Sequence, residues 1–211
     1  MATKNIETHG RYVSLTKRNA ELKRETGETQ ISVILDIDGT GQYQIETGNG
    51  MFDHMLAQIS RHGLIDLQIS AKGDTHVGWH HLVEDTAIVI GRALNQAVGN
   101  MDGIVRMNHS YVPLDEALAL VVVDFGGRGY AVIDADLTDT DMGDLSPQLV
   151  THFMETLAVE GKFNLHVCVL AGASNHHKSE AIFKALARAM RGALTIDPRQ
   201  TKIPSTKDSI G

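Results

Sequence analysis

The pattern His-His-x-x-Glu occurs twice in this chain, at residues 80–84 and again at residues 176–180, which is an offset of 96 residues. Each copy opens an amphipathic segment with the apolar spacing of a helix. Both segments reach an Arg-Ala pair, at Arg92 and at Arg188, and the offset is again 96 residues. This repeat restricts the chain to folds that are built from two similar halves.

A further histidine precedes each copy of the motif. His54 lies 26 residues before His80, and His152 lies 24 residues before His176. Both histidines belong to segments with helical spacing of apolar residues, and an apolar, β-branched segment separates each of them from the motif. The repeat therefore covers a helix, a strand and a second helix.

The remaining elements follow from alternation, turn residues and helix start signals. In the first half we expect strands at 11–18, 29–36, 42–47 and 64–71, with helices at 51–61 and 79–98. In the second half we expect strands at 104–112, 116–124, 129–135 and 164–170, with helices at 146–160 and 176–194. Both halves thus have the order βββαβα.

Two small sheets whose helices have apolar faces bury those faces best when the helices stack between the sheets. The predicted fold class is α+β, with internally duplicated βββαβα half-domains and helices packed between two four-stranded mixed sheets. We expect a single globular unit. Its predicted parts are an N-terminal tail at 1–9, half-domain repeats at 10–99 and 100–196, and a C-terminal tail at 197–211 that closes over a substrate.

Composition excludes several classes of function. The chain has 211 residues, of which 42% are hydrophobic, and this suffices for a packed core. Its net charge is -7 and it has no basic block, which argues against nucleic acid as a partner. We find no signal peptide and no apolar span long enough for a membrane, so we expect a cytoplasmic protein with a small-molecule partner. The single cysteine, Cys168, lies in an apolar run and is expected to be buried in a strand.

The repeated residues have the chemistry of metal ligands. Neutral imidazoles and carboxylates bind divalent Mn, Fe, Co, Ni and Zn. On a helix Glu84 lies one turn from both His80 and His81, but the two adjacent imidazoles point roughly 100° apart, so each His-His pair is expected to serve two metals. With four ligands for each metal, the expected set is His54, His80, His81, Glu84, His152, His176, His177 and Glu180.

Several longer motifs resemble those of one enzyme family. They include Phe52-Asp53-His54-Met55-Leu56, Arg61-His62-Gly63, Gly73-Asp74-Thr75-His76, Pro113-Leu114-Asp115-Glu116-Ala117, both His-His-x-x-Glu motifs and Pro204-Ser205-Thr206-Lys207. Together these patterns are similar to imidazoleglycerol-phosphate dehydratase of histidine biosynthesis, and the resemblance runs from about residue 10 to residue 208.

This resemblance implies dehydration of D-erythro-imidazole glycerol phosphate to imidazole acetol phosphate. It also implies two Mn²⁺ ions in each active site and a homo-oligomer of 24 subunits with sites at the subunit interfaces. The metal ligands of the family fall on the eight residues that the repeat selects. Its substrate-binding residues fall on Glu28, Gln58, Arg106, Arg128, Lys184, Ser205 and Lys207.

Two positions depart from the pattern of the family. Trp79 precedes the first histidine pair where many relatives have an acidic residue, and Asp208 follows Lys207 where glycine is common. We expect Trp79 to alter the edge of the site and Asp208 to alter the mobility of the terminal loop. Asp115, at a turn, is expected to give structural support near the site.

The implied reaction needs an unusual electron sink. The C2 proton of the substrate is not adjacent to a carbonyl, so the imidazole ring has to take up the charge. Two metals that bind the ring nitrogens would favour an imidazolate, which can expel the C3 hydroxyl. Glu180 is the first candidate for the proton-transferring residue, in addition to or in exchange for metal ligation, and Glu28 is the second.

The metal ligands alone are compatible with two other classes of protein. A di-metal hydrolase also holds two ions in a cage of histidine and glutamate. A metal-storage protein, or one whose subunits are linked by metal, would use the same residues without catalysis. The four cations of the substrate-binding set, together with the Ser205 hydroxyl, favour a phosphorylated substrate and hence the dehydratase.

Overall fold

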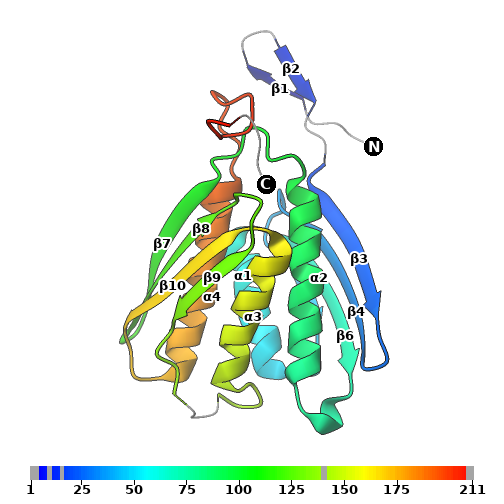
Figure 1. Ribbon diagram of the computed structural model, residues 1–211, viewed down its shortest axis with the longest axis vertical. Coiled ribbons are helices and arrows are strands. Elements are labelled where there is room, and N and C mark those ends of the chain that lie inside the picture. The colour runs from blue at the N-terminus through cyan, green and yellow to red at the C-terminus, as the bar shows by residue number, and fades with distance from the viewer. Residues whose placement is uncertain (1–4, 9–10, 15–16, 139–141, 208–211) are drawn as a thin grey trace.

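A computed structural model describes residues 5–8, 11–14, 17–138 and 142–207 of the chain. Two four-stranded sheets form the outer layers and four helices lie between them (Figure 1). The buried apolar side chains of both halves form one continuous core between the sheets. The predicted fold class is confirmed.

The two sheets have the same topology. The first contains β3 (Asn19–Glu25), β4 (Thr29–Asp36), β5 (Tyr43–Glu46) and β6 (Asp66–Gly73) in the order β3-β4-β6-β5. The second contains β7 (Met107–Leu114), β8 (Ala117–Asp124), β9 (Tyr130–Asp134) and β10 (Asn164–Ala171) in the order β7-β8-β10-β9. In each sheet the pair formed by the third and fourth strands is parallel and the other pairs are antiparallel. The sheets are therefore mixed, and the duplication extends to every strand.

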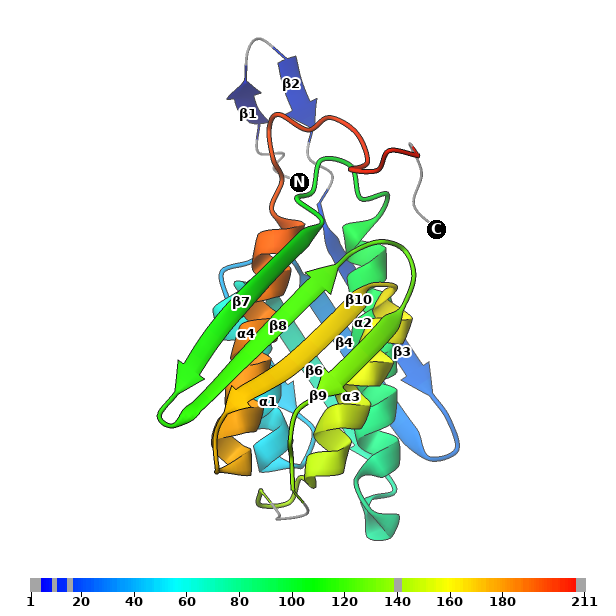
Figure 2. The same ribbon diagram turned by 60° about the vertical axis from the view of Figure 1, so that its left-hand side comes forward.

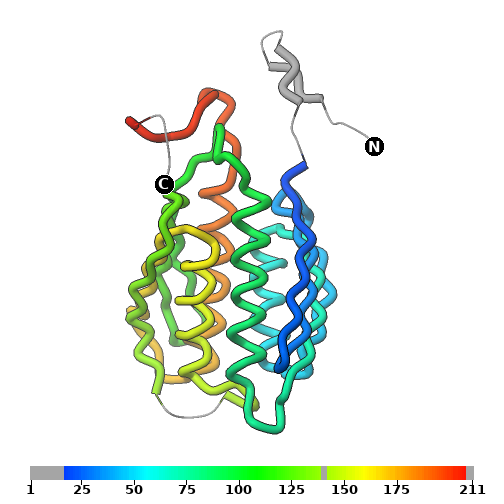
Figure 3. Tube along the Cα trace, turned by 45° about the vertical axis from the view of Figure 1, so that its right-hand side comes forward, coloured from blue at the N-terminus to red at the C-terminus, as the bar shows by residue number. Residues whose placement is uncertain are grey.

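The helices pack across the boundary between the halves. They are α1 (Gly50–Gly63), α2 (His80–Val98), α3 (Pro147–Gly161) and α4 (Asn175–Leu194), with a short 3-10 helix at Thr75–Val77. Helix α2 covers β3 and β4, and α4 covers β7 and β8. Helix α2 also packs against α3, and α1 packs against α4 (Figure 3). Each motif helix thus contacts the upstream helix of the other half.

Local sequence signals define where the helices begin and end. The Asn49 side chain accepts a hydrogen bond from the backbone N–H of Phe52 at 2.8 Å, and Ser174 caps α4 in the same way by accepting from His177. Helices α1 and α3 both end at a residue in the left-handed region, Leu64 and Lys162. All four helices run in the same direction, so their first turns lie together at one end of the molecule (Figure 1).

One expected strand is wrong. The sequence predicted the first strand of the sheet at 11–18, but β2 covers only Arg11–Ser14 and pairs with β1 (Asn5–Thr8), which falls inside the expected N-terminal tail. The first strand of the sheet is β3, Asn19–Glu25. It is an edge strand with the sequence Asn-Ala-Glu-Leu-Lys-Arg-Glu, in which only Ala20 is buried. So little apolar alternation gives no strand signal in the sequence.

The outer faces of the two sheets differ in polarity. Exposed side chains on the first sheet include Glu21, Lys23, Gln30, Gln68 and Lys72. The second sheet exposes Met107, Tyr111, Val122, Tyr130, Val132 and Leu170 (Figure 2 shows this sheet in front of the helices).

Cys168 was expected to be buried but is half-buried, since it lies in β10 among these outward apolar residues. In the part of the chain that the structure describes, no helix has the length and hydropathy needed to cross a bilayer.

The close approach of α2 and α3 depends on Gly91. A Cβ atom at this position would lie 2.8 Å from Cβ of Glu160 and 2.9 Å from the backbone nitrogen of Gly161. We predict that Gly91→Ala destabilises the protein by about 1–3 kcal/mol through overpacking, which exceeds the gain of about 1 kcal/mol from helix propensity. Denaturant unfolding of the metal-free chain measures this change. Gln96→Ala, on the exposed face of α2, is the control, and equal stability of the two variants would contradict the prediction.

Candidate metal centre

The first group of possible metal ligands lies between α1 and α4. Glu180 Oε2 is 3.0 Å from His54 Nε2 and 3.1 Å from His176 Nε2. The ligand atoms of these three residues all lie within 4.8 Å of one another. His54 belongs to the first half of the chain, whereas the other two residues belong to the second. We call this group trio 1.

The second group lies between α2 and α3. Glu84 Oε1 is 3.4 Å from His152 Nε2, and Glu84 Oε2 is 3.7 Å from His80 Nε2. The rings of His80 and His152 are stacked with their centroids 4.7 Å apart. The ligand atoms of this group, which we call trio 2, also lie within 4.8 Å of one another. Each trio thus joins the motif of one half to the upstream histidine of the other.

A buried nitrogen without a hydrogen bond supports a cation at trio 2. His152 Nε2 is buried, and among the described residues it has no hydrogen-bond partner. Leaving a buried polar atom unsatisfied costs about 1–3 kcal/mol. A divalent ion between His152, His80 and Glu84 would give this nitrogen a partner, and two imidazoles with a carboxylate suit Mn, Fe, Co, Ni or Zn.

The electrostatics of trio 1 keep its carboxylate ionised. Burial by itself raises the pKa of the Glu180 carboxyl. Hydrogen bonds from Lys184 and from the two trio histidines outweigh burial and lower this pKa to about 2. Lys184 Nζ is 2.6 Å from Glu180 Oε1. Glu180 is therefore an anion at neutral pH, which suits a metal ligand better than a proton acceptor.

The second histidine of each motif lies outside the trios. His81 Nδ1 is 3.1 Å from Asp74 Oδ2 and 3.7 Å from Glu28 Oε2, and these three residues form a further group of possible ligands. His177 Nδ1 is 2.7 Å from Glu116 Oε2. The hydrogen bond to Asp74 raises the pKa of His81, and the hydrogen bond to Glu116 raises the pKa of His177. The two trios thus contain six of the eight expected ligands, and the other two, His81 and His177, face carboxylates outside the expected set.

Three of the expected substrate-binding residues lie at the metal end. Gln58 is one turn after His54, and its Nε2 atom donates to the His54 carbonyl oxygen at 3.2 Å. Lys184 contacts trio 1, and Glu28 approaches His81. These side chains lie where they can contact a ligand held at the trios.

The other phosphate candidates lie at the opposite end of the helices. The backbone N–H of Arg106 donates to the Ala193 carbonyl in the last turn of α4. At 1.5 Å per residue, this point is roughly 25 Å along α4 from His176. The Arg106 guanidinium donates to Asp124 and to the Pro204 carbonyl, so it lies beside the C-terminal segment with Ser205 and Lys207. Arg128 follows β8, at the same end.

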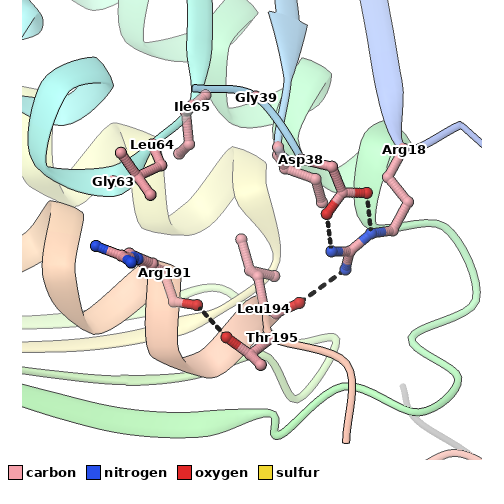
Figure 4. A pocket seen from close by; sticks show the side chains of 10 residues that line it. Arg18, Asp38, Gly39, Gly63, Leu64, Ile65, Arg191, Leu194 and Thr195 are labelled. Carbon is pink, nitrogen blue, oxygen red and sulfur yellow. Dashed lines mark hydrogen bonds and ion pairs between the residues drawn. The ribbon is translucent and has the colours of Figure 1, made fainter. Parts of the chain in front are cut away.

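A cavity of about 190 Å³ also lies at this opposite end, next to the last turns of α1 and α4 (Figure 4). Its polar wall is already bonded, because the Arg18 guanidinium pairs with Asp38 and donates to the Leu194 carbonyl at 2.8 Å. None of the predicted site residues lines it. The cavity is therefore separate from the candidate metal centre.

Sequence reasoning missed the roles of Asp74 and Glu116. A signal for Glu116 exists, because Glu28 immediately precedes β4 and Glu116 immediately precedes β8, the equivalent strand. Alignment of the halves on these strands, with an offset of 88 residues, would have paired the two glutamates.

Asp115 is 3.8 Å from His177 Nε2, as expected for a residue near the site. Trp79 is the N-cap residue of α2, and Asp208 lies outside the described residues.

The duplicated α+β scaffold and the two candidate metal-binding trios are consistent with the class of metal-dependent enzymes. A family model of imidazoleglycerol-phosphate dehydratase matches residues 47–190. The imidazoleglycerol-phosphate dehydratase of Dehalococcoides mccartyi (strain CBDB1) is 52% identical over 197 residues, covering 93% of this chain and 99% of the relative. The chain belongs to this family and is a hydro-lyase of histidine biosynthesis.

Two solved structures agree with this assignment. Imidazoleglycerol-phosphate dehydratase from Staphylococcus aureus has a TM-score of 0.77 and 34% identity, covering 85% of this chain and 99% of that one. The enzyme from Pyrococcus furiosus, solved in complex with (S)-C348, has a TM-score of 0.78 and 31% identity, covering 90% of this chain and 100% of that one. The family resemblance stated from the motifs is therefore confirmed.

The unpartnered nitrogen of trio 2 leads to a stability prediction. Replacing His152 by Leu removes this nitrogen and one metal ligand, so the metal-free variant should be at least as stable as the wild type. At a Mn²⁺ concentration 100-fold above the dissociation constant, each occupied site adds about 2.7 kcal/mol to the unfolding free energy. We expect His152→Leu to lose one such increment in thermal unfolding with added Mn²⁺. Gln68→Leu, at an exposed position of β6 in the first sheet, is the control, and a full metal response in His152→Leu would exclude trio 2 as a site.

Proposed function

We propose that this chain dehydrates D-erythro-imidazole glycerol phosphate to imidazole acetol phosphate at a site with two divalent ions, which we assign as Mn²⁺. The observation that supports this proposal best is the presence of two His-His-Glu trios in a chain that belongs to the dehydratase family. Two bound ions would supply Lewis acidity that favours the imidazolate form of the substrate ring.

The residues around the trios supply the other requirements of the reaction. Lys184 and Gln58 lie beside trio 1, where they can orient the polar groups of the substrate. The Glu28 side chain is 57% exposed and its ion-pair contact is with His81 at 3.7 Å, whereas Glu180 is held by Lys184 at 2.6 Å, so Glu28 is the more available of the two for proton transfer. We therefore assign metal ligation to Glu180 first and proton transfer to Glu28 first, with Glu180 as the second candidate for proton transfer.

The position of the phosphate candidates favours sites shared between subunits. Arg106, Ser205 and Lys207 lie near the last turn of α4, whereas trio 1 lies at its first turns. One substrate molecule is much shorter than the roughly 25 Å between them. A complete site then needs the metal end of one subunit and the phosphate end of another. His81 and His177, which join neither trio, are the ligands that adjacent subunits would supply.

The apolar outer face of the second sheet supports a homo-oligomer. Val122 in β8 and Val132 in β9 flank His166 in β10 on the same face of the sheet. Exposed apolar side chains in this number are typical of a protein–protein interface, whereas the strands of the first sheet expose two large apolar side chains, Ile34 and Tyr43. We propose that copies of this chain associate into the 24-subunit particle implied by the family resemblance. The cytoplasmic location stays a prediction.

Metal dependence of turnover tests the proposed function. We expect metal-free protein to form no imidazole acetol phosphate, and addition of Mn²⁺ to restore product formation. The assay also measures inorganic phosphate, because a di-metal hydrolase would release it from the same substrate. Product formation without added metal, or phosphate release instead of dehydration, would contradict the proposal.

A mixing experiment tests the shared site. We expect His152→Leu and Lys207→Ala to be nearly inactive as separate proteins, because one lacks a metal ligand and the other a phosphate contact. When the two are mixed without metal and then assembled with Mn²⁺, some sites receive an intact metal end and an intact phosphate end. Activity should then rise well above the mean of the separate variants. If the site lies within one chain, mixing will restore nothing.

A further inference from the structure

The second histidine of each motif contacts its carboxylate through a different ring atom from the trio histidines. In both trios the Nε2 atoms face the glutamate oxygens. His81 instead faces both carboxylate oxygens of Asp74 through Nδ1, at 3.1 and 3.2 Å, and His177 faces Glu116 through Nδ1 at 2.7 Å. In both of these residues Nε2 is the ring atom that remains for a further ligand.

The Glu116 carboxylate is itself anchored, and the backbone of Asp74 is fixed. Glu116 Oε1 accepts hydrogen bonds from the backbone N–H groups of Ala173 and Ser174, at 3.2 and 2.9 Å. Ser174 is the N-cap of α4, so Glu116 links the start of β8 to the helix that carries His177. Asp74 donates its backbone N–H to the Glu28 carbonyl at 3.1 Å. The Glu116 carboxylate therefore does not have to be ordered when His177 binds a ligand.

The two halves supply this contact from different elements. Asp74 follows β6, whereas Glu116 precedes β8. The residue after β10, at the place of Asp74, is Gly172, whose Cβ would lie 2.7 Å from Lys178 Cγ, so no side chain fits there. Glu116 occupies the place of Glu28, which is 3.7 Å from His81. His81 and His177 are thus both hydrogen-bonded through Nδ1, although their carboxylate partners come from non-equivalent positions of the two halves.

The chemistry of the contact fixes the tautomer of the ring. An ionised carboxylate only accepts hydrogen bonds, so the imidazole nitrogen that faces it has to carry the proton. In a neutral ring the other nitrogen then has a free lone pair, which is the form that binds a metal. Asp74 and Glu116 therefore present His81 and His177 with Nε2 ready to act as a ligand.

We propose that Asp74 and Glu116 are positioning residues that hold His81 and His177 in the Nδ1–H tautomer, so that Nε2 completes the metal centre. This inference rests on the proposed di-metal function. A purely structural role is the competing explanation for Glu116, since its carboxylate also binds the backbone before α4. The two roles respond differently to substitution by glutamine.

Glutamine at position 116 preserves the structural contact but reverses the tautomer. Its amide oxygen can still accept from Ala173 and Ser174, which leaves the NH₂ group facing His177 Nδ1. That nitrogen then has to accept a hydrogen bond, so the proton moves to Nε2 and blocks metal binding. Alanine removes the backbone contact but leaves the ring free to choose its tautomer. Glu116→Gln should thus be the more stable variant and the weaker metal binder.

The experiment compares the wild type with Glu116→Gln, Glu116→Ala and a control, Glu21→Gln, on the outer face of β3. All four proteins are first made metal-free, and their thermal unfolding and their binding of added Mn²⁺ are then measured. Free Mn²⁺ is measured by electron paramagnetic resonance. We expect Glu116→Gln to unfold at nearly the wild-type temperature and to bind one class of Mn²⁺ about 10–100-fold more weakly. Glu116→Ala should unfold at a lower temperature and bind Mn²⁺ at least as well as Glu116→Gln. Glu21→Gln should match the wild type in both measurements.

Three outcomes would overturn the inference, and they are distinguishable. If Glu116→Gln binds Mn²⁺ like the wild type while Glu116→Ala does not, Glu116 only supports the start of α4. If the wild type binds three ions per chain and Asp74→Asn binds two, the group of Glu28, Asp74 and His81 is a separate metal site. If the wild type binds no Mn²⁺ at all, the proposed function fails together with the inference.

Discussion

The site depends on the packing of each motif helix against the upstream helix of the other half. Contact between α2 and α3 brings His152 to Glu84, and contact between α1 and α4 brings His54 to Glu180. The helices run in the same direction, so first turns that are distant in sequence lie side by side. Neither half could form a trio alone. The duplication therefore explains why the metal ligands come in two sets and why both sets need the whole chain.

The direction of the helices also sets the charge that the trios need. Helix N-termini carry a partial positive charge, which is unfavourable for a cation. A site made only of neutral imidazoles at this end would add no compensating charge. Glu84 and Glu180 supply one anion for each trio, and the hydrogen bonds to Glu180 keep its pKa at about 2. The carboxylate in each His-His-x-x-Glu motif thus offsets the positive charge of the helix N-termini, which lie at the same end of the molecule as the motifs.

Much of the fold could be predicted because both halves repeat strong signals. The β-branched runs of β4 and β8 and the amphipathic motif helices gave their elements directly, whereas β3 was missed because its outward residues are charged and only Ala20 is buried. The ligands were predicted as a set, but their grouping was not. An offset of 96 residues identifies equivalent positions, and equivalent positions in a duplicated fold are not neighbours. Which helix packs on which depends on close approaches such as that at Gly91.

The two halves share their candidate metal ligands but differ in the outer surfaces of their sheets and in the segments that follow them. Both retain trio histidines and a second histidine bonded through Nδ1. The second sheet has the more apolar outer face, and only the second half leads into the segment that contacts Arg106. Because the helices of both halves run in the same direction, the two ends of the molecule would differ even in a perfectly symmetric duplication. What the second half adds is the C-terminal segment beside Arg106, and in the proposed shared site this segment would bring the phosphate end of one subunit to the metal end of another.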